Sequence, residues 1–126
     1  MSTEKDLERD REIKEQFAFF LERGFAYQYL YEKGGDSACS YIYRFTKGRD
    51  YFEVRELSGG DELSFVVYRA GTYAFPALKS KYKKQYRAFS FKHLFKRSTA
   101  KERRALLAEI LQEEYETSPD FFGIKK

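Results

Sequence analysis

Four short segments between Phe25 and Arg69 show the residue pattern of β-strands, and glycine-containing turns separate them. In the first two segments an aromatic residue occupies every second position, which places the rings on one face of each strand. The turns are too short to connect parallel neighbours, so adjacent strands must run antiparallel. The pattern predicts a four-stranded antiparallel meander with strands at residues 25–31, 39–46, 51–57 and 62–69. The turns between them are predicted at residues 33–37, 47–50 and 58–61.

Apolar residues spaced three and four apart predict a helix on each side of this meander. The first helix covers residues 4–23, where Ile13, Phe17 and Phe20 share one face and Gly24 follows the last turn. The last helix covers Ala100–Glu116, and Thr99 and Glu102 have the spacing of an N-terminal capping box.

The region between the meander and the last helix is less regular. Phe75, Leu78, Tyr82, Tyr86 and Phe89 form a second apolar stripe, with Pro76 in the first turn of the predicted helix. This spacing indicates that most of these rings belong to the core. Residues 90–97 fit either a strand or a short helix, and we favour the helix. The run of apolar residues at 64–68 predicts a fourth strand that is central or covered on both faces.

The length of 126 residues and the single cysteine, Cys39, predict one domain that folds by packing alone, without a disulfide. The fold class is α+β: an N-terminal helix, a four-stranded antiparallel meander, and two or three C-terminal helices on one sheet face. Residues 1–9 and 119–126 are expected to fray. We find neither a secretory signal nor a run of about 18 apolar residues, so we expect a cytoplasmic protein that does not enter a membrane.

The charge is distributed unevenly along the chain. Residues 79–104 contain eleven Lys or Arg residues and one acid, Glu102, so this segment carries about +10 while the rest carries about −6. Such a segment indicates a partner of opposite charge, either nucleic acid or an acidic protein. The candidate anion-binding residues are Lys79, Lys81, Lys83, Lys84, Arg87, Lys92, Lys96, Arg97, Arg103 and Arg104. The simplest alternative is a solvated helix face whose charge is balanced by acids of the same molecule.

Tyrosine is the second unusual feature, with eleven residues in the chain. Those on the first two strands suggest an aromatic sheet face, which is typical of protein interfaces and of homodimers. The candidate interface residues are Tyr27, Tyr29, Tyr31, Tyr41 and Tyr43. The alternative function is therefore a protein interaction or homodimerising domain.

Catalysis is the third alternative. His93 is the only histidine, and no carboxylate lies within six residues of it to orient it as a general base. The carboxylates Glu53, Glu56, Asp61 and Glu62 could serve an enzyme of unknown type, but cross-strand pairing with Arg44 or Arg55 explains them more simply. The sequence thus predicts a non-enzymatic binding module without a metal or cofactor.

Overall fold

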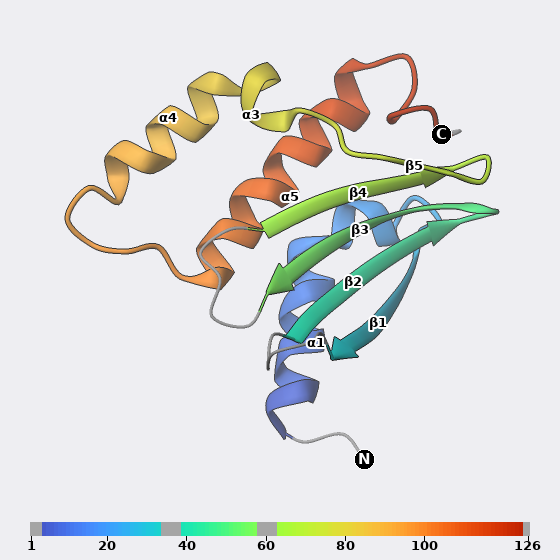
Figure 1. Ribbon diagram of the computed structural model, residues 1–126, viewed down its shortest axis with the longest axis horizontal. Coiled ribbons are helices and arrows are strands. Elements are labelled where there is room, and N and C mark those ends of the chain that lie inside the picture. The colour runs from blue at the N-terminus through green and yellow to red at the C-terminus, as the bar shows by residue number, and fades with distance from the viewer. Residues whose placement is uncertain (1–3, 34–38, 58–62, 125–126) are drawn as a thin grey trace.

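The computed structural model describes residues 4–33, 39–57 and 63–124. Its central element is an antiparallel sheet with strand order β1-β2-β3-β4-β5 (Figure 1). The strands are β1 (Ala26–Lys33), β2 (Cys39–Lys47), β3 (Asp50–Leu57), β4 (Leu63–Arg69) and β5 (Thr72–Ala74). The predicted α+β class and meander topology are confirmed. The predicted turns at residues 34–37 and 58–61 lie outside the described residues.

The sheet has five strands, one more than the four that the sequence pattern predicts, and the additional strand is β5. Arg69 pairs with Thr72, so Ala70 and Gly71 alone form the turn between β4 and β5. Both have positive φ values, 52° and 81°, which is the conformation of a type I′ hairpin turn. A strand of three residues is too short for alternation to reveal it. With β5 beside it, β4 lies inside the sheet, as its apolar run predicted.

The last helix, α5 (Ala100–Thr117), matches its prediction closely. The Thr99 side chain accepts a hydrogen bond from the Glu102 amide, and the Glu102 carboxylate accepts one from the Thr99 amide. This reciprocal pair is the predicted capping box, and it sets the start of the helix because it satisfies amides that have no partner within the helix.

The other predicted helices are interrupted. The N-terminal segment is divided at Phe17 into α1 (Glu4–Gln16) and α2 (Ala18–Leu21). The second segment begins later than predicted and is divided at Tyr82 into α3 (Leu78–Lys81) and α4 (Lys83–Lys92). Both breaks fall at buried aromatic residues, so the packing of a ring takes precedence over the continuity of the helix.

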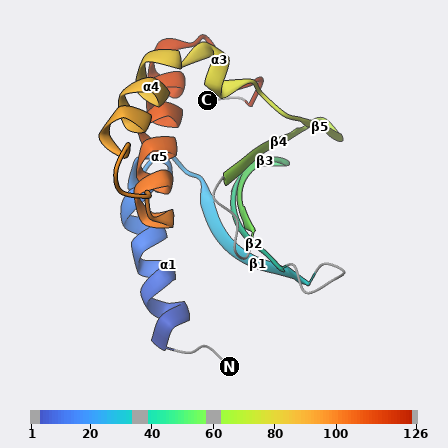
Figure 2. The ribbon, with the colours of Figure 1, turned by 60° about the vertical axis from the view of Figure 1, so that its left-hand side comes forward.

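The described helices lie on one face of a strongly twisted sheet (Figure 2). Between the two layers, Phe45 packs against Phe17 and Phe52 packs against Phe20. Buried residues of α5 belong to the same cluster. Phe20 and Phe52 meet with ring centroids 5.1 Å apart in an edge arrangement. These contacts bury aromatic surface on both layers, which is the main source of stability for such a core.

The chain after α5 also joins this core. Phe121 and Ile124 are buried and pair with each other through an isolated β-bridge. Phe121 and Ile124 therefore pack against the helix-covered side, although residues 119–126 were expected to fray. Across the described residues, no helix is both long enough and apolar enough to cross a bilayer.

Candidate functional site

The basic segment contains one arginine that is buried. Arg104 is 5% exposed, and its guanidinium donates hydrogen bonds to Glu12 of α1, to Glu56 of β3 at 2.9 Å and to Gln16 at 3.2 Å. Arg104 thus connects α5 with α1 and β3. It was a candidate for anion binding, but its donors are used inside the fold, so we leave it out of the exposed cationic surface.

Lys81 is also engaged within the molecule. Its Nζ lies 2.7 Å from the Glu114 carboxylate, which accepts further hydrogen bonds from the Tyr82 and Ser118 hydroxyls. Burial opposes the ionisation of Glu114, but these three donors outweigh it and lower the pKa of the carboxyl below its ordinary value. This network holds α3 against α5.

Three other candidate anion-binding residues also interact with groups of the same molecule. Arg103 donates to the Ser98 carbonyl at 2.7 Å and to the Ser98 hydroxyl at 3.2 Å. Lys79 and Arg97 are exposed, and each engages another group.

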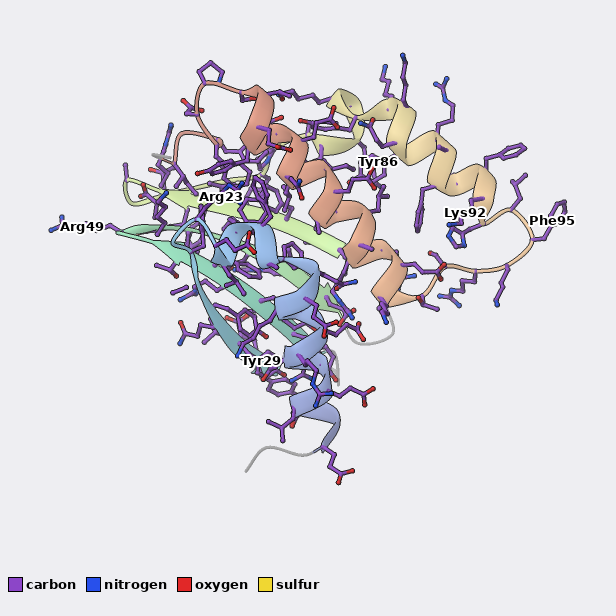
Figure 3. The ribbon with its side chains drawn as sticks, turned by 180° about the vertical axis from the view of Figure 1, so that it is seen from behind. Arg23, Tyr29, Arg49, Tyr86, Lys92 and Phe95 are labelled. Carbon is purple, nitrogen blue, oxygen red and sulfur yellow. The ribbon has the colours of Figure 1, made fainter. Side chains whose placement is uncertain are left out.

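The other five candidates lie on an exposed surface formed by α4 and the turn that follows it. Lys83, Lys84, Arg87 and Lys92 of α4 and Lys96 of the following turn are all exposed. Within the described residues, none of the five takes part in an ion pair. Viewed from behind, α4 lies at the margin of the molecule, and blue side-chain tips project from its outer side into solvent (Figure 3). We call these five residues, together with Phe91 and Phe95, the α4 surface.

Two aromatic rings stand among these cations. Phe91 is 76% exposed, and Phe95 is fully exposed and points away from the molecule (Figure 3). Phe91 lies four residues after Arg87, so both project from the same side of α4. The predicted short helix over residues 90–97 ends at Lys92, and Phe95 therefore lies on a turn between α4 and α5.

The remaining rings of the predicted apolar stripe differ in their surroundings. Tyr82 is buried, and Tyr86 and Phe89 are half-buried on the inner side of α4. Phe75 precedes the helix and is 74% exposed, so it does not belong to the core as its spacing predicted. The stripe was misleading because the helix begins three residues after Phe75 and is interrupted at Tyr82.

The five tyrosines of the predicted interface lie on the helix-covered face of the sheet. Tyr43 is fully buried, while Tyr27, Tyr29 and Tyr41 are half-buried beside α1, and Tyr31 alone of these five is exposed. Two of these hydroxyls donate to acids of the same molecule, Tyr27 to Asp10 at 2.7 Å and Tyr43 to Glu56 at 2.9 Å. Burial is the main cause that raises the pKa of both phenols.

The opposite sheet face carries a polar cluster that the sequence analysis predicted only in part. Glu53 is completely buried between Arg44 and Arg55, and each guanidinium lies 2.7 Å from its carboxylate. The cross-strand pair of Glu53 with Arg44 confirms the simpler interpretation for Glu53. Glu56 pairs instead with Arg104, and Asp61 and Glu62 lie outside the described residues. Beside it, Tyr51 stacks on Tyr68 with ring centroids 4.8 Å apart. Alternation could have predicted that Tyr51 and Tyr68 lie on the sheet face opposite to Tyr43, because successive side chains along a strand point to opposite faces.

His93 does acquire a carboxylate neighbour. Its Nε2 lies 3.4 Å from Glu102, and its ring packs against Phe89 at 4.5 Å between centroids. The same Glu102 carboxylate is held by Thr99, whose hydrogen bonds lower the pKa of the glutamate. Within the described residues, no group of three His, Cys, Asp or Glu side chains is placed to hold a metal ion.

Comparisons with protein-family models, with curated proteins and with solved structures found no match to this chain. The geometry of the α4 surface is therefore the basis on which a function is inferred.

Proposed function

We propose that this chain binds single-stranded nucleic acid through the α4 surface. The observation that carries the proposal is the presence of two solvent-exposed rings, Phe91 and Phe95, among five exposed cations. Binding of single strands combines cationic groups that follow the backbone with aromatic rings on which unpaired bases stack. In the free protein the apolar surface of these two rings is in contact with water, which is unfavourable. Stacking on a base would remove that surface from water.

The composition of the surface favours nucleic acid over an acidic protein. Four of its five cations are lysines, and Arg87 is the exception. Protein interfaces are depleted in lysine and enriched in arginine, whereas phosphates are bound well by lysine as a point charge. An acidic protein partner is the competing interpretation, and oligonucleotide binding measured in a salt series distinguishes it from a nucleic-acid partner.

The number of exposed cations sets the expected salt dependence. If each of the five neutralises one phosphate, the slope of log affinity against log salt is about −3.5 for a single strand. Raising the salt from 50 to 200 mM then weakens binding by about 100-fold.

Fluorescence anisotropy of a labelled oligothymidine in a salt series tests the proposal. The variant K84E/R87E should weaken binding at least about tenfold and flatten the salt slope. The matched control R11E/R49E makes the same change in net charge at exposed residues of α1 and of the β2–β3 hairpin. It should change binding much less. Equal losses in the two variants would show attraction to net charge alone and would refute a specific surface.

The rings are tested separately from the charges. Because stacking contributes about 1–3 kcal/mol per base, F91A and F95A should each weaken binding roughly 5- to 150-fold without altering the salt slope. Both side chains are exposed, so their truncation should leave the fold intact. If the oligonucleotide does not bind at low salt, or binds F91A/F95A as tightly as the parent, the proposal is wrong and an acidic protein becomes the better candidate.

A further inference from the structure

A cleft of about 570 Å³ lies on the inner side of α4. Its walls come from α3, α4, α5 and the start of β4, and they are mainly apolar. The principal apolar wall residues are Phe65, Leu78, Tyr86, Phe89, Leu106 and Leu107. The volume is typical of sites for small organic ligands and is several times that of an apolar cavity of ~150 Å³ that binds benzene.

The helix α4, which forms one wall of the cleft, does not pack tightly against the core. No residue of α4 is buried, and Tyr86 and Phe89 are only half-buried although they face the rest of the fold. The non-helical residue Tyr82 precedes the helix, and the turn of residues 93–99 follows it. Protein interiors normally fill such space to the density of organic crystals. The apolar walls of this cleft therefore lack packing partners that a ligand of matching shape would supply.

A cation with an unsatisfied donor lines the same cleft. The Nε of Arg103 is buried and has no hydrogen-bond partner in the described structure, although Nη1 is bonded to Ser98. A buried donor without an acceptor costs free energy, so an anionic oxygen that reached this Nε through a shift of the Arg103 side chain would be stabilising. Lys79 also lines the cleft, where it engages another group. The cleft thus combines an apolar interior with the guanidinium of Arg103 in its wall.

We propose that the cleft binds a single-chain amphiphile with an anionic head, such as a medium-chain carboxylate or alkyl phosphate. The hydrocarbon chain packs among Leu78, Phe89 and Leu107, and the anionic oxygens accept hydrogen bonds from Arg103. A guanidinium suits this role because its fork of donors binds carboxylate and phosphate in the same way. This site lies on the side of α4 opposite Arg87 and Phe91, so it is independent of the proposed nucleic-acid surface.

Calorimetric titration with three twelve-carbon probes tests the proposal: dodecanoate and dodecyl phosphate below their micelle concentrations, and dodecanol below its solubility limit. Dodecanoate or dodecyl phosphate should bind saturably at one site, and the tighter of the two identifies the head group. Dodecanol should bind at least about tenfold more weakly, because it lacks the charge that strengthens the hydrogen bond. R103Q should remove this preference, while the matched control R49Q at the exposed β2–β3 hairpin should retain it.

A second variant keeps the test decisive if R103Q fails to fold. Ser90 is exposed and lines the cleft, so S90W should fill part of the space and weaken all three probes. Absence of saturable binding to the parent protein, or equal binding of the anionic probes to the parent and S90W, would overturn the proposal. Titrating the oligonucleotide into the same samples shows whether the nucleic-acid proposal stands or fails separately.

Discussion

Replacing Arg104 by methionine tests whether this arginine is a structural link between three elements. R104M keeps most of the apolar length of the side chain but removes the donors to Glu12, Glu56 and Gln16. Two carboxylates would then face each other across the gap without the charge that lies between them. Because Arg104 connects α5 to α1 and β3, we expect loss of global stability and not only local fraying.

The size of the loss follows from the contacts. Hydrogen bonds to charged groups contribute about 1.5–3 kcal/mol each, and the bond to Gln16 contributes about 1 kcal/mol. The Glu12 and Glu56 side chains keep 24% and 15% of their surface exposed, so water recovers part of the lost interaction. We therefore expect a fall of about 3–5 kcal/mol in the free energy of unfolding, the range for breaking a buried ion pair.

Urea denaturation followed by circular dichroism measures this change. With a slope of about 2 kcal/mol per molar urea, the midpoint should fall by about 2 M. The control R11M alters an exposed arginine of α1 and should change stability by less than about 0.5 kcal/mol. The triple variant R104M/E12Q/E56Q removes the charges as a set and should recover part of the loss. A loss below about 1 kcal/mol in R104M would refute the argument that this network stabilises the fold.

Three further predictions concern pH and backbone geometry. Because the pKa of Glu114 is lowered in the folded protein, its ionised carboxylate contributes stability above the ordinary glutamate pKa near 4.5. This contribution is lost as the pH falls through the pKa of Glu114 in the folded protein. E114Q should therefore show a smaller fall of the urea midpoint with decreasing pH. Burial and the hydrogen bond with Tyr73 raise the pKa of Tyr51 to about 12, so its contribution is complete below about pH 10 and is lost between about pH 10 and 12. Y51F should therefore lose less stability than the parent over that alkaline range in the same assay. Gly123 has a φ of 89°, and a Cβ there would lie 1.6 Å from Arg69 Nη1, so G123A should lose about 1–2 kcal/mol by urea denaturation.

Local sequence signals determined most of the secondary structure. The alternation of rings and the short turns defined four strands and their antiparallel order, because both signals act between residues that are close in the chain. Thr99 and Glu102 set the start of α5 for the same reason. The basic segment was also visible in the sequence, and eight of its ten candidate cations are exposed, five of them on the α4 surface.

Only the tertiary structure decided which of these residues are available to a partner. The sequence could not show that Arg104 meets Glu12 and Glu56, because those residues lie 92 and 48 positions away. Nor could spacing separate the exposed Phe75 from the half-buried Phe89, because the start of the helix at Leu78 and its interruption at Tyr82 depend on how the helix packs. Charge and periodicity can be read from the sequence, whereas the burial of a side chain depends on contacts between segments far apart in the chain. The α4 surface is defined by which side chains those contacts leave exposed.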